Sequence, residues 1–341
     1  MCIRFDLLAL CGGKEGEIIL VSRAIKPAHR PNGITPIKPM LARIDKARTT
    51  ADIASLIADL ELMGVSSPFA FFSSQDNHDP ANVIAYVAAG GLGLPDRDYY
   101  IKPDQRFAEA REKYKSHVTK MLTLAGDSDA SAAAASARIL AFETELANAS
   151  LDNVALRDPA ATDHKVSFAE LQRLSPAFDW AAYYKRIGVK PAPLNVTEPE
   201  FVKQFSKMLT ASRLADWRSY LKWRVVNSAS DSLSTPLVEA NYAFYNAYLY
   251  GQKEMKPRPT RCAESADNLL GEAVGKKYVE KYFPPEAKAR MTELVRNEIA
   301  AIGEIIRGLD WMSSETKTKA LEKLDRKSTR LNSSHTDISR M

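Results

Sequence analysis

The chain has 341 residues, 45% of them hydrophobic and 26% charged, which is the composition of a globular protein. Its net charge of +5 comes from the two ends, since residues 1–39 contribute +3 and residues 327–341 contribute +2. Residues 40–326 are therefore neutral overall, and no basic surplus indicates nucleic-acid binding. No apolar run reaches the roughly 20 residues that span a bilayer.

The first 39 residues are expected to be a leader or linker of doubtful origin. The apolar stretch at residues 7–10 is too short for the core of a signal peptide, and Leu10 stands where a lipoprotein box before Cys11 needs a small residue. Five prolines and glycines between Pro27 and Pro39 interrupt any regular element.

Between residues 40 and 326 the dominant hydrophobic period is helical, which predicts a mainly α, multi-helix lobe with few short strands. A capping box at Thr197–Glu200 marks one helix start. Short strands are possible around residues 68–72 and 194–197. Apolar residues at three- and four-residue steps predict helices over 107–122, 129–146, 199–209, 217–225, 236–251, 286–309 and from Ser313 or Ser314 to near Leu324.

The aromatic residues in these helices could be mistaken for a base-stacking or cofactor surface. At helical spacing we interpret them as core. The last fifteen residues, 327–341, are polar and lack helical periodicity. They resemble translated vector read-through, so a non-native tail is expected there.

One stretch cannot be continuous helix or strand: residues 90–100 read GGLGLPDRDYY. Glycine frees φ, proline fixes it, and Asp side chains bond their own backbone, so a specified loop is predicted, with an internal network of Asp96, Arg97 and Asp98. A phosphate-binding loop is disfavoured, because the third glycine of a dinucleotide fingerprint and the Lys-Ser/Thr of a P-loop are both missing.

GGLGLPDRDYY resembles a signature of the neprilysin-type (M13) zinc metallopeptidases, in their N-terminal, non-zinc part. Further segments resemble that family in the same order along residues 40–325. They are YKxHVxKML at 114–122, FExELA at 142–147, RDP at 157–159, FDW at 178–180, WRxYLxWR at 217–224, GQKEM at 251–255, YVxxYF at 278–283 and WMSxxTKxxAxxKL at 311–324. One departure is Pro259-Thr260, where the family has a tryptophan and a basic residue.

The resemblance implies an M13 N-terminal helical domain over residues 40–326, a fragment without the HExxH zinc domain. Its implied role is the non-catalytic lobe of a zinc metalloendopeptidase, shaping the peptide cavity and restricting access to it. Zinc, peptide substrates and the C-terminal zinc domain as partner belong to the full-length parent. Family members are periplasmic, extracellular or membrane-anchored, and no usable export signal identifies the location of this chain.

The residues themselves offer no zinc site. A zincin needs two histidines four apart on one helix with a glutamate between them. The five histidines are spaced otherwise, at His29, His78, His117, His164 and His335. We therefore expect no catalytic, cofactor-binding or metal-binding residue in this chain, and predict that it is inactive alone.

Three further features have a structural interpretation. His78 lies in a polar loop and is the most site-like histidine, while His117 lies within a helix as a packed or surface residue. Cys262 is the only thiol of the body, and we expect it to be buried or half-buried and inert. Asn246-Ala247-Tyr248 resembles a substrate-binding motif of the family at the wrong place in the chain, so that role is not transferred.

The alternative function is a stand-alone helical peptide-binding or scaffold module.

Overall fold

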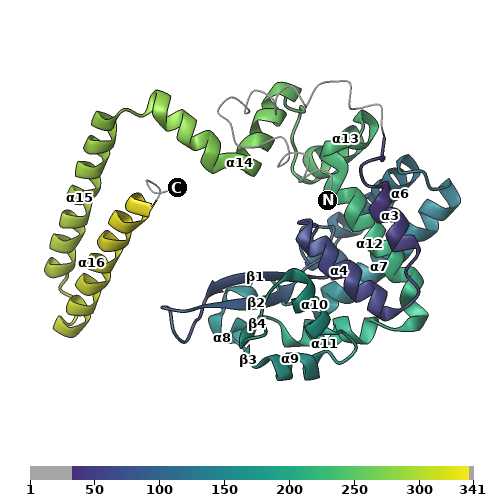
Figure 1. Cartoon of the computed structure of the whole chain (residues 1–341), viewed down its shortest axis with the longest axis horizontal. Coiled ribbons are helices and arrows are strands. Elements are labelled where there is room, and N and C mark those ends of the chain that lie inside the picture. Colours follow the sequence, from purple (N-terminus) through teal and green to yellow (C-terminus); the bar gives the residue numbers. More distant parts are fainter. Residues whose placement is uncertain (1–32, 338–341) are drawn as a thin grey trace. The chain divides into compact units, whose positions relative to one another are not determined.

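The computed structural model describes residues 33–337, with side chains through residue 325, and it forms two compact units that divide after Pro257. The predicted mainly α class is confirmed (Figure 1). The helices of the first unit are α3 (Lys38–Asp45), α4 (Thr50–Leu62), α5 (Asp98–Ile101), α6 (Gln105–Leu124), α7 (Asp129–Ala149), α8 (Pro159–Thr162), α9 (Phe168–Leu174), α10 (Trp180–Ile187), α11 (Pro199–Met208), α12 (Leu214–Ala229) and α13 (Thr235–Asn241).

One four-stranded sheet accompanies these helices, in the order β1-β2-β4-β3. Strands β1 (Phe69–Gln75) and β4 (Leu194–Val196) lie where strands were expected, whereas β2 (Val83–Ala89) and β3 (Lys165–Val166) were not anticipated. β1 and β2 form an antiparallel hairpin, β2 and β4 are parallel, and β3 is antiparallel to β4. β2 was missed because its sequence, VIAYVAA, lacks the alternation of a half-exposed strand.

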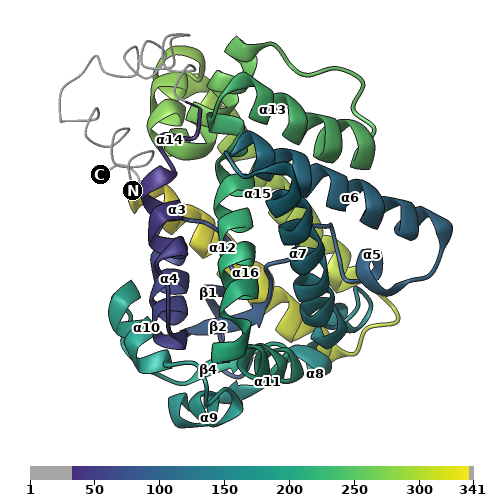
Figure 2. The ribbon, with the colours of Figure 1, turned by 90° about the vertical axis from the view of Figure 1, so that its right-hand side faces the viewer.

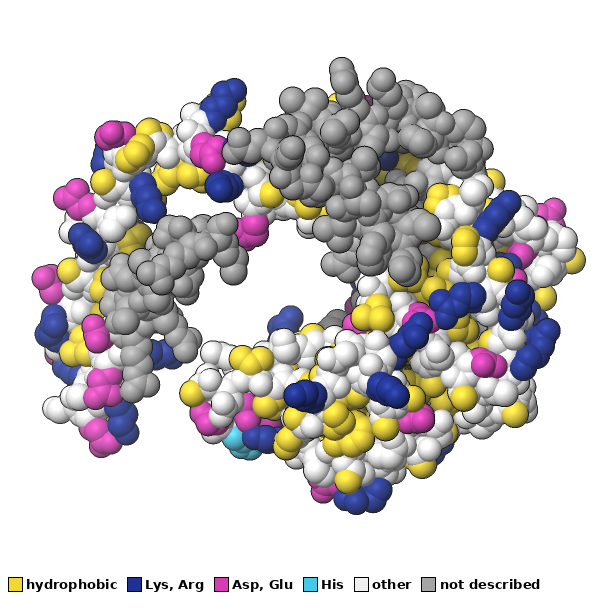
Figure 3. Space-filling view, in the orientation of Figure 1, with side chains coloured by type: hydrophobic (Ala, Val, Ile, Leu, Met, Phe, Trp, Pro, Cys, Tyr) yellow, Lys and Arg dark blue, Asp and Glu magenta, His cyan; other side chains and the backbone are white. Residues whose placement is uncertain are grey.

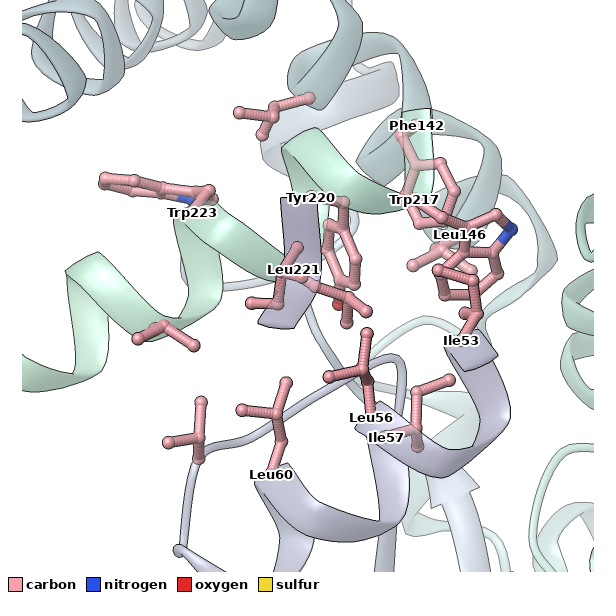
Figure 4. Packing of buried hydrophobic residues seen from close by; sticks show 14 of the residues in the cluster. Ile53, Leu56, Ile57, Leu60, Phe142, Leu146, Trp217, Tyr220, Leu221 and Trp223 are labelled. Atoms are coloured by element: carbon pink, nitrogen blue, oxygen red, sulfur yellow. The ribbon is translucent and has the colours of Figure 1, made fainter. Parts of the chain in front are cut away.

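The core of the first unit is built around α12, which runs between α3 and α4 on one side and α7 on the other (Figure 2). Its apolar face is fully buried, as the helical spacing predicted. Figure 4 shows this packing, in which side chains of α4 point towards those of α12, with α7 alongside. The labelled residues are Ile53, Leu56, Ile57 and Leu60 of α4, Phe142 and Leu146 of α7, and Trp217, Tyr220, Leu221 and Trp223 of α12.

A second aromatic cluster fixes the hairpin to α10 and α11. The ring of Phe69, at the start of β1, lies 5.0 Å from Trp180, 5.4 Å from Tyr183 and 5.4 Å from Phe205, measured between centroids. Such contacts stabilise by burial and by edge-to-face geometry. The aromatic residues at helical spacing in α7, α10, α11 and α12 are therefore core.

The predicted capping box at Thr197–Glu200 is wrong. The N-cap of α11 is Glu198, and no side-chain capping bond is made there. The Thr197 N–H instead extends the sheet by donating to Val87 O at 2.9 Å. The Glu198 carboxylate is occupied elsewhere, by the backbone N–H groups of Ala89 and Leu151.

The single helix expected over 236–251 is also wrong in part. α13 ends at Asn241, and a π-helix follows from Tyr242 to Leu249. The wider winding buries Phe244 and leaves its tyrosine neighbours half-buried. In this arrangement the Tyr245 hydroxyl donates to Gly93 O at 3.0 Å.

The second unit contains α14 (Arg258–Tyr282), interrupted at Leu270 by non-helical dihedrals, then α15 (Pro285–Gly308) and α16 (Ser314–Asp337). The last helix was expected to end near Leu324. That expectation is wrong, because no glycine or proline stands between residues 314 and 337 to end it.

The domain boundaries at 39/40 and 326/327 stay predictions.

Large apolar side chains of this unit reach the surface (Figure 3). Within the described side chains, α14 has no buried residue, and α15 has only Gly303. None of the described helices is long and apolar enough to cross a membrane. Cys2, Cys11, residues 7–10 and His29 lie outside the described residues, as does the side chain of His335.

Candidate functional site

The glycine-rich stretch is a loop from Gly90 to Arg97 between β2 and α5, as predicted, although its last residues form the short helix α5. The predicted internal network of Asp96, Arg97 and Asp98 is right only in part: Asp96 Oδ1 accepts from the Asp98 N–H at 2.8 Å, but Arg97 is engaged outside the loop. Arg97 donates to Ser150 O at 2.6 Å, beyond the end of α7, and Asp98 pairs with Lys102 at 2.6 Å. The guanidinium thus ties the loop to a distant helix end.

Two glycines let the loop approach buried tyrosines. Gly91 has φ +75°, and its carbonyl accepts a hydrogen bond from Tyr220 Oη at 2.8 Å. A Cβ at Gly91 would lie 2.1 Å from that hydroxyl, and one at Gly93 would lie 1.8 Å from Tyr114 Oη. Neither position has room for a side chain.

Glu143, on α7, is the centre of the site. Its carboxylate accepts hydrogen bonds from Tyr100 Oη at 2.7 Å, Tyr114 Oη at 2.9 Å and Gly93 N at 3.3 Å. Tyr114 Oη in turn accepts from Trp223 Nε1 at 2.7 Å. Four elements (the loop, α5, α6 and α7) therefore meet at one carboxylate, and α12 is linked to it through Tyr114.

Burial raises the pKa of Glu143 to about 7, against the opposing effects of the Arg224 charge and the donated hydrogen bonds. Arg224 makes no ion pair with it and donates instead to Ser66 O at 2.8 Å and Leu92 O at 3.1 Å. Burial likewise raises the pKa of Tyr100 and Tyr114 well above the usual range, so both stay protonated donors.

A carboxyl with a raised pKa can be a general acid or base when a substrate reaches it. Glu143 has no exposed surface, and its oxygens already accept from the loop and two tyrosines. The arrangement therefore holds the loop in place. Sequence reasoning missed Glu143 as a site residue, although a charge between Ile139 and Leu146 on an apolar helix face was the available signal.

The three histidines whose side chains are described make separate contacts. The buried ring of His117 stacks on Phe244 at 4.7 Å, and burial lowers its pKa to about 3. His78 Nε2 lies 3.0 Å from Asp163, at the surface. His164 Nδ1 lies 3.2 Å from Val196 O.

Across residues 33–325, no group of three His, Cys, Asp or Glu side chains could hold a metal ion. These residues therefore do not fit a catalytic zinc. Cys262 is a half-buried free thiol, as expected. Asn246, in the π-helix, donates to Gln252 at 3.1 Å and is engaged locally.

Comparisons with known proteins agree with one another. The model of peptidase family M13 matches residues 26–331. Human endothelin-converting enzyme 1 is 31% identical over 269 residues, which cover 76% of this chain and 34% of that protein. The zinc metalloprotease Zmp1 of Mycobacterium tuberculosis, in its open state, superposes with a TM-score of 0.81 at 30% identity, covering 94% of this chain and 51% of that one. Its inhibitor complex gives a TM-score of 0.80 at 30% identity, with 90% and 50% covered.

Proposed function

This chain belongs to peptidase family M13, as the N-terminal domain, and we propose that it is the non-catalytic lobe of a zinc metalloendopeptidase. In that role the lobe lines a cavity that admits peptides and excludes folded proteins. The chain spans about half the length of Zmp1 and about a third of endothelin-converting enzyme 1, so both relatives contain a further part. We infer that the zinc ligands and the general base belong to the corresponding part of the parent protein.

The observation that carries the proposal is the uncovered apolar surface of the second unit. Its exposed large side chains include Leu269, Tyr278, Tyr282, Leu294 and Ile305, each at least 47% exposed. Monomeric proteins seldom expose contiguous apolar patches without a binding role. A further domain that packs on α14 and α15 would remove this surface from water.

A shallow groove on α15 supports the same partner. It has a volume of about 480 Å³ and is lined by Phe283, just before α15, and by Ala287, Arg290, Met291, Glu293, Leu294 and Asn297 of α15. An amphipathic helix of the missing part could lie in such a groove, presenting its own apolar face.

The first test measures zinc content and peptide hydrolysis by the purified chain. We expect neither stoichiometric zinc nor chelator-sensitive hydrolysis. If both are found, the assignment as a non-catalytic lobe is overturned.

The second test joins this chain to the part of Zmp1 that lies beyond its match, in one polypeptide. The chimera should bind zinc and hydrolyse short peptides, while a folded protein substrate stays intact. A control chimera carries Leu294→Gln and Ile305→Gln, which should weaken the assembly of the two parts. Equal activity of both chimeras would argue that the apolar surface has another role.

A further inference from the structure

The outer edge of β1 is open. β1 is the first strand in the sheet order, and among the described residues it pairs only with β2. Val87, opposite Phe71, accepts from Thr197 N on the β4 side. Phe71 and Val87 are therefore a non-hydrogen-bonded pair, in which each residue directs its N–H and C=O away from the other strand. The N–H and C=O of Phe71, and those of Ser73 two residues on, point to the open side of β1.

This edge lacks the usual protection. The strand reads FAFFSSQ, without a charged residue or proline, and its seven residues pair one-to-one with β2, so it has no bulge. Natural edge strands are blunted by lysine, proline, bulges or a covering element. Residues 72–75 are exposed, and no loop or cap backbone hydrogen bond of the described residues involves Phe71 or Ser73.

The two faces of the strand differ. Phe71 packs on α10, with ring centroids 5.3 Å from Tyr184 and 5.8 Å from Tyr183. Phe72 faces the other way, is 45% exposed, and stacks on Tyr86 at 5.4 Å with an interplanar angle of 18°. An incoming strand would therefore find an exposed aromatic ring, that of Phe72, for one of its side chains on that face.

Charge gives the edge a direction. Beyond Gln75 the hairpin tip carries Asp79, which is exposed, and His78 holds Asp163 beside it. The remaining charged neighbours, Asp76 and Lys165, pair with each other. At this end the three aspartates outnumber Lys165 by two, and the excess negative charge attracts a cationic peptide terminus.

We propose that the outer edge of β1 binds an extended peptide as an added antiparallel strand. The backbone of Phe71 and Ser73 forms the new ladder, Phe72 contacts an apolar side chain, and the positive amino terminus lies towards the hairpin tip. The ligand must be a polypeptide, because only a β-strand has donors and acceptors at the spacing of the N–H and C=O groups along the edge of β1. The site does not rest on the proposed function, because it is complete in this chain and needs no zinc.

The first experiment measures amide hydrogen exchange of the purified full chain with a heptapeptide probe, a lysine followed by three valine–threonine pairs. We expect slower exchange at Phe71 and Ser73 on saturation, and weaker binding after N-acetylation of the probe. Unchanged exchange at these two amides at saturating peptide would overturn the proposal. Hydrolysis is not measured, so the outcome is separate from that of the chimera.

The second experiment compares Ser73→Pro with Ser73→Ala by fluorescence anisotropy of the labelled probe. Proline removes an outward N–H that β2 does not use, whereas alanine keeps it. We expect at least about tenfold weaker binding for proline and unchanged binding for alanine. A probe N-methylated at every internal amide should also fail to bind, and this result does not depend on the folding of the variant.

Analytical ultracentrifugation of the same proteins without peptide distinguishes a peptide ligand from a second copy of the chain at the edge of β1. A monomer across concentrations supports a peptide ligand. Concentration-dependent dimers of the wild type that Ser73→Pro abolishes would overturn it in favour of a second copy of the chain.

Discussion

Glu143 shows how one residue organises the signature loop. Its carboxylate accepts from Tyr100, Tyr114 and Gly93, and burial raises its pKa to about 7. An ionised carboxylate in a fully buried position is unfavourable unless donors surround it. The tyrosines and the loop amide are those donors, so the loop conformation and the carboxylate stabilise each other.

The raised pKa predicts a pH dependence of stability. Glu143 is protonated more tightly in the folded than in the unfolded chain, so its contribution to the free energy of unfolding is fully present below about pH 4.5 and is lost as pH rises to about 7. Relative to Glu143→Gln, which does not titrate, wild type should lose about 3 kcal/mol across this range. Urea unfolding of both proteins at intervals from pH 4.5 to 8 measures it. A pH-independent difference would contradict the assignment.

The glycines of the loop give a second test at the same scale. Gly91→Ala introduces both a strained φ and a Cβ 2.1 Å from Tyr220 Oη. Gly188 is the matched control, because it has nearly the same φ, +76°, with nothing within 4 Å of the added atom. We expect a loss of about 1 kcal/mol for Gly188→Ala and about 3 kcal/mol or more for Gly91→Ala. Similar losses in urea unfolding would show that the close approach is unimportant.

At the scale of elements, Glu198 joins three segments that are far apart in the sequence. From the start of α11 it accepts from Ala89 N, at the end of β2, at 2.8 Å, and from Leu151 N, after α7, at 2.7 Å. Arg97, which donates to Ser150 O, adds a second connection to the same helix end. These bonds place the loop between sheet and helices.

Removing this connection should destabilise the first unit. The amide of Glu198→Gln can accept with only one oxygen, so a partly buried backbone N–H loses its partner, at a cost of about 1 to 2 kcal/mol. Glu200→Gln, on the same helix, changes only an exposed pair with Lys203 and should cost under about 0.5 kcal/mol. Thermal unfolding by circular dichroism compares them, and equal shifts would refute the role of Glu198.

The start of the same helix explains why the capping box at Thr197–Glu200 was predicted wrongly. The pattern indicated a local bond between Thr197 and Glu200, whereas α11 has Glu198 as its N-cap and the Thr197 N–H donates to Val87 O in the sheet. A sequence pattern reports local chemistry only. Such a pattern does not predict hydrogen bonds between residues that are far apart in the sequence.

For the whole molecule, the contrast between the two units matters most. The first buries most of its aromatic residues, while the second exposes residues such as Leu294, Ile305 and Trp311, the last 77% exposed. The isolated chain should therefore bind the dye ANS and self-associate. A monodisperse, ANS-silent monomer would contradict this expectation.

Substitutions can show which surface causes the ANS binding and self-association. Leu294→Gln with Ile305→Gln should lower ANS fluorescence and association without changing the unfolding of the first unit. The control is Val154→Gln, which alters a single side chain that is 79% exposed in the first unit. If the control lowers the signal equally, the second unit is not the binding surface.

The sequence by itself determined the helical class, most helix positions, the apolar faces of the first unit and the family, because these follow from local periodicity and from ordered motifs. It also indicated that 90–100 is a loop. Only the tertiary structure decided which residues the loop contacts and what it holds together. Glu143, Tyr114 and Gly93 meet through contacts between distant segments, and the open edge of β1 is defined by the strand order. Long-range pairing has no signature in a single sequence, which is why the loop could be recognised before its function in the fold was known.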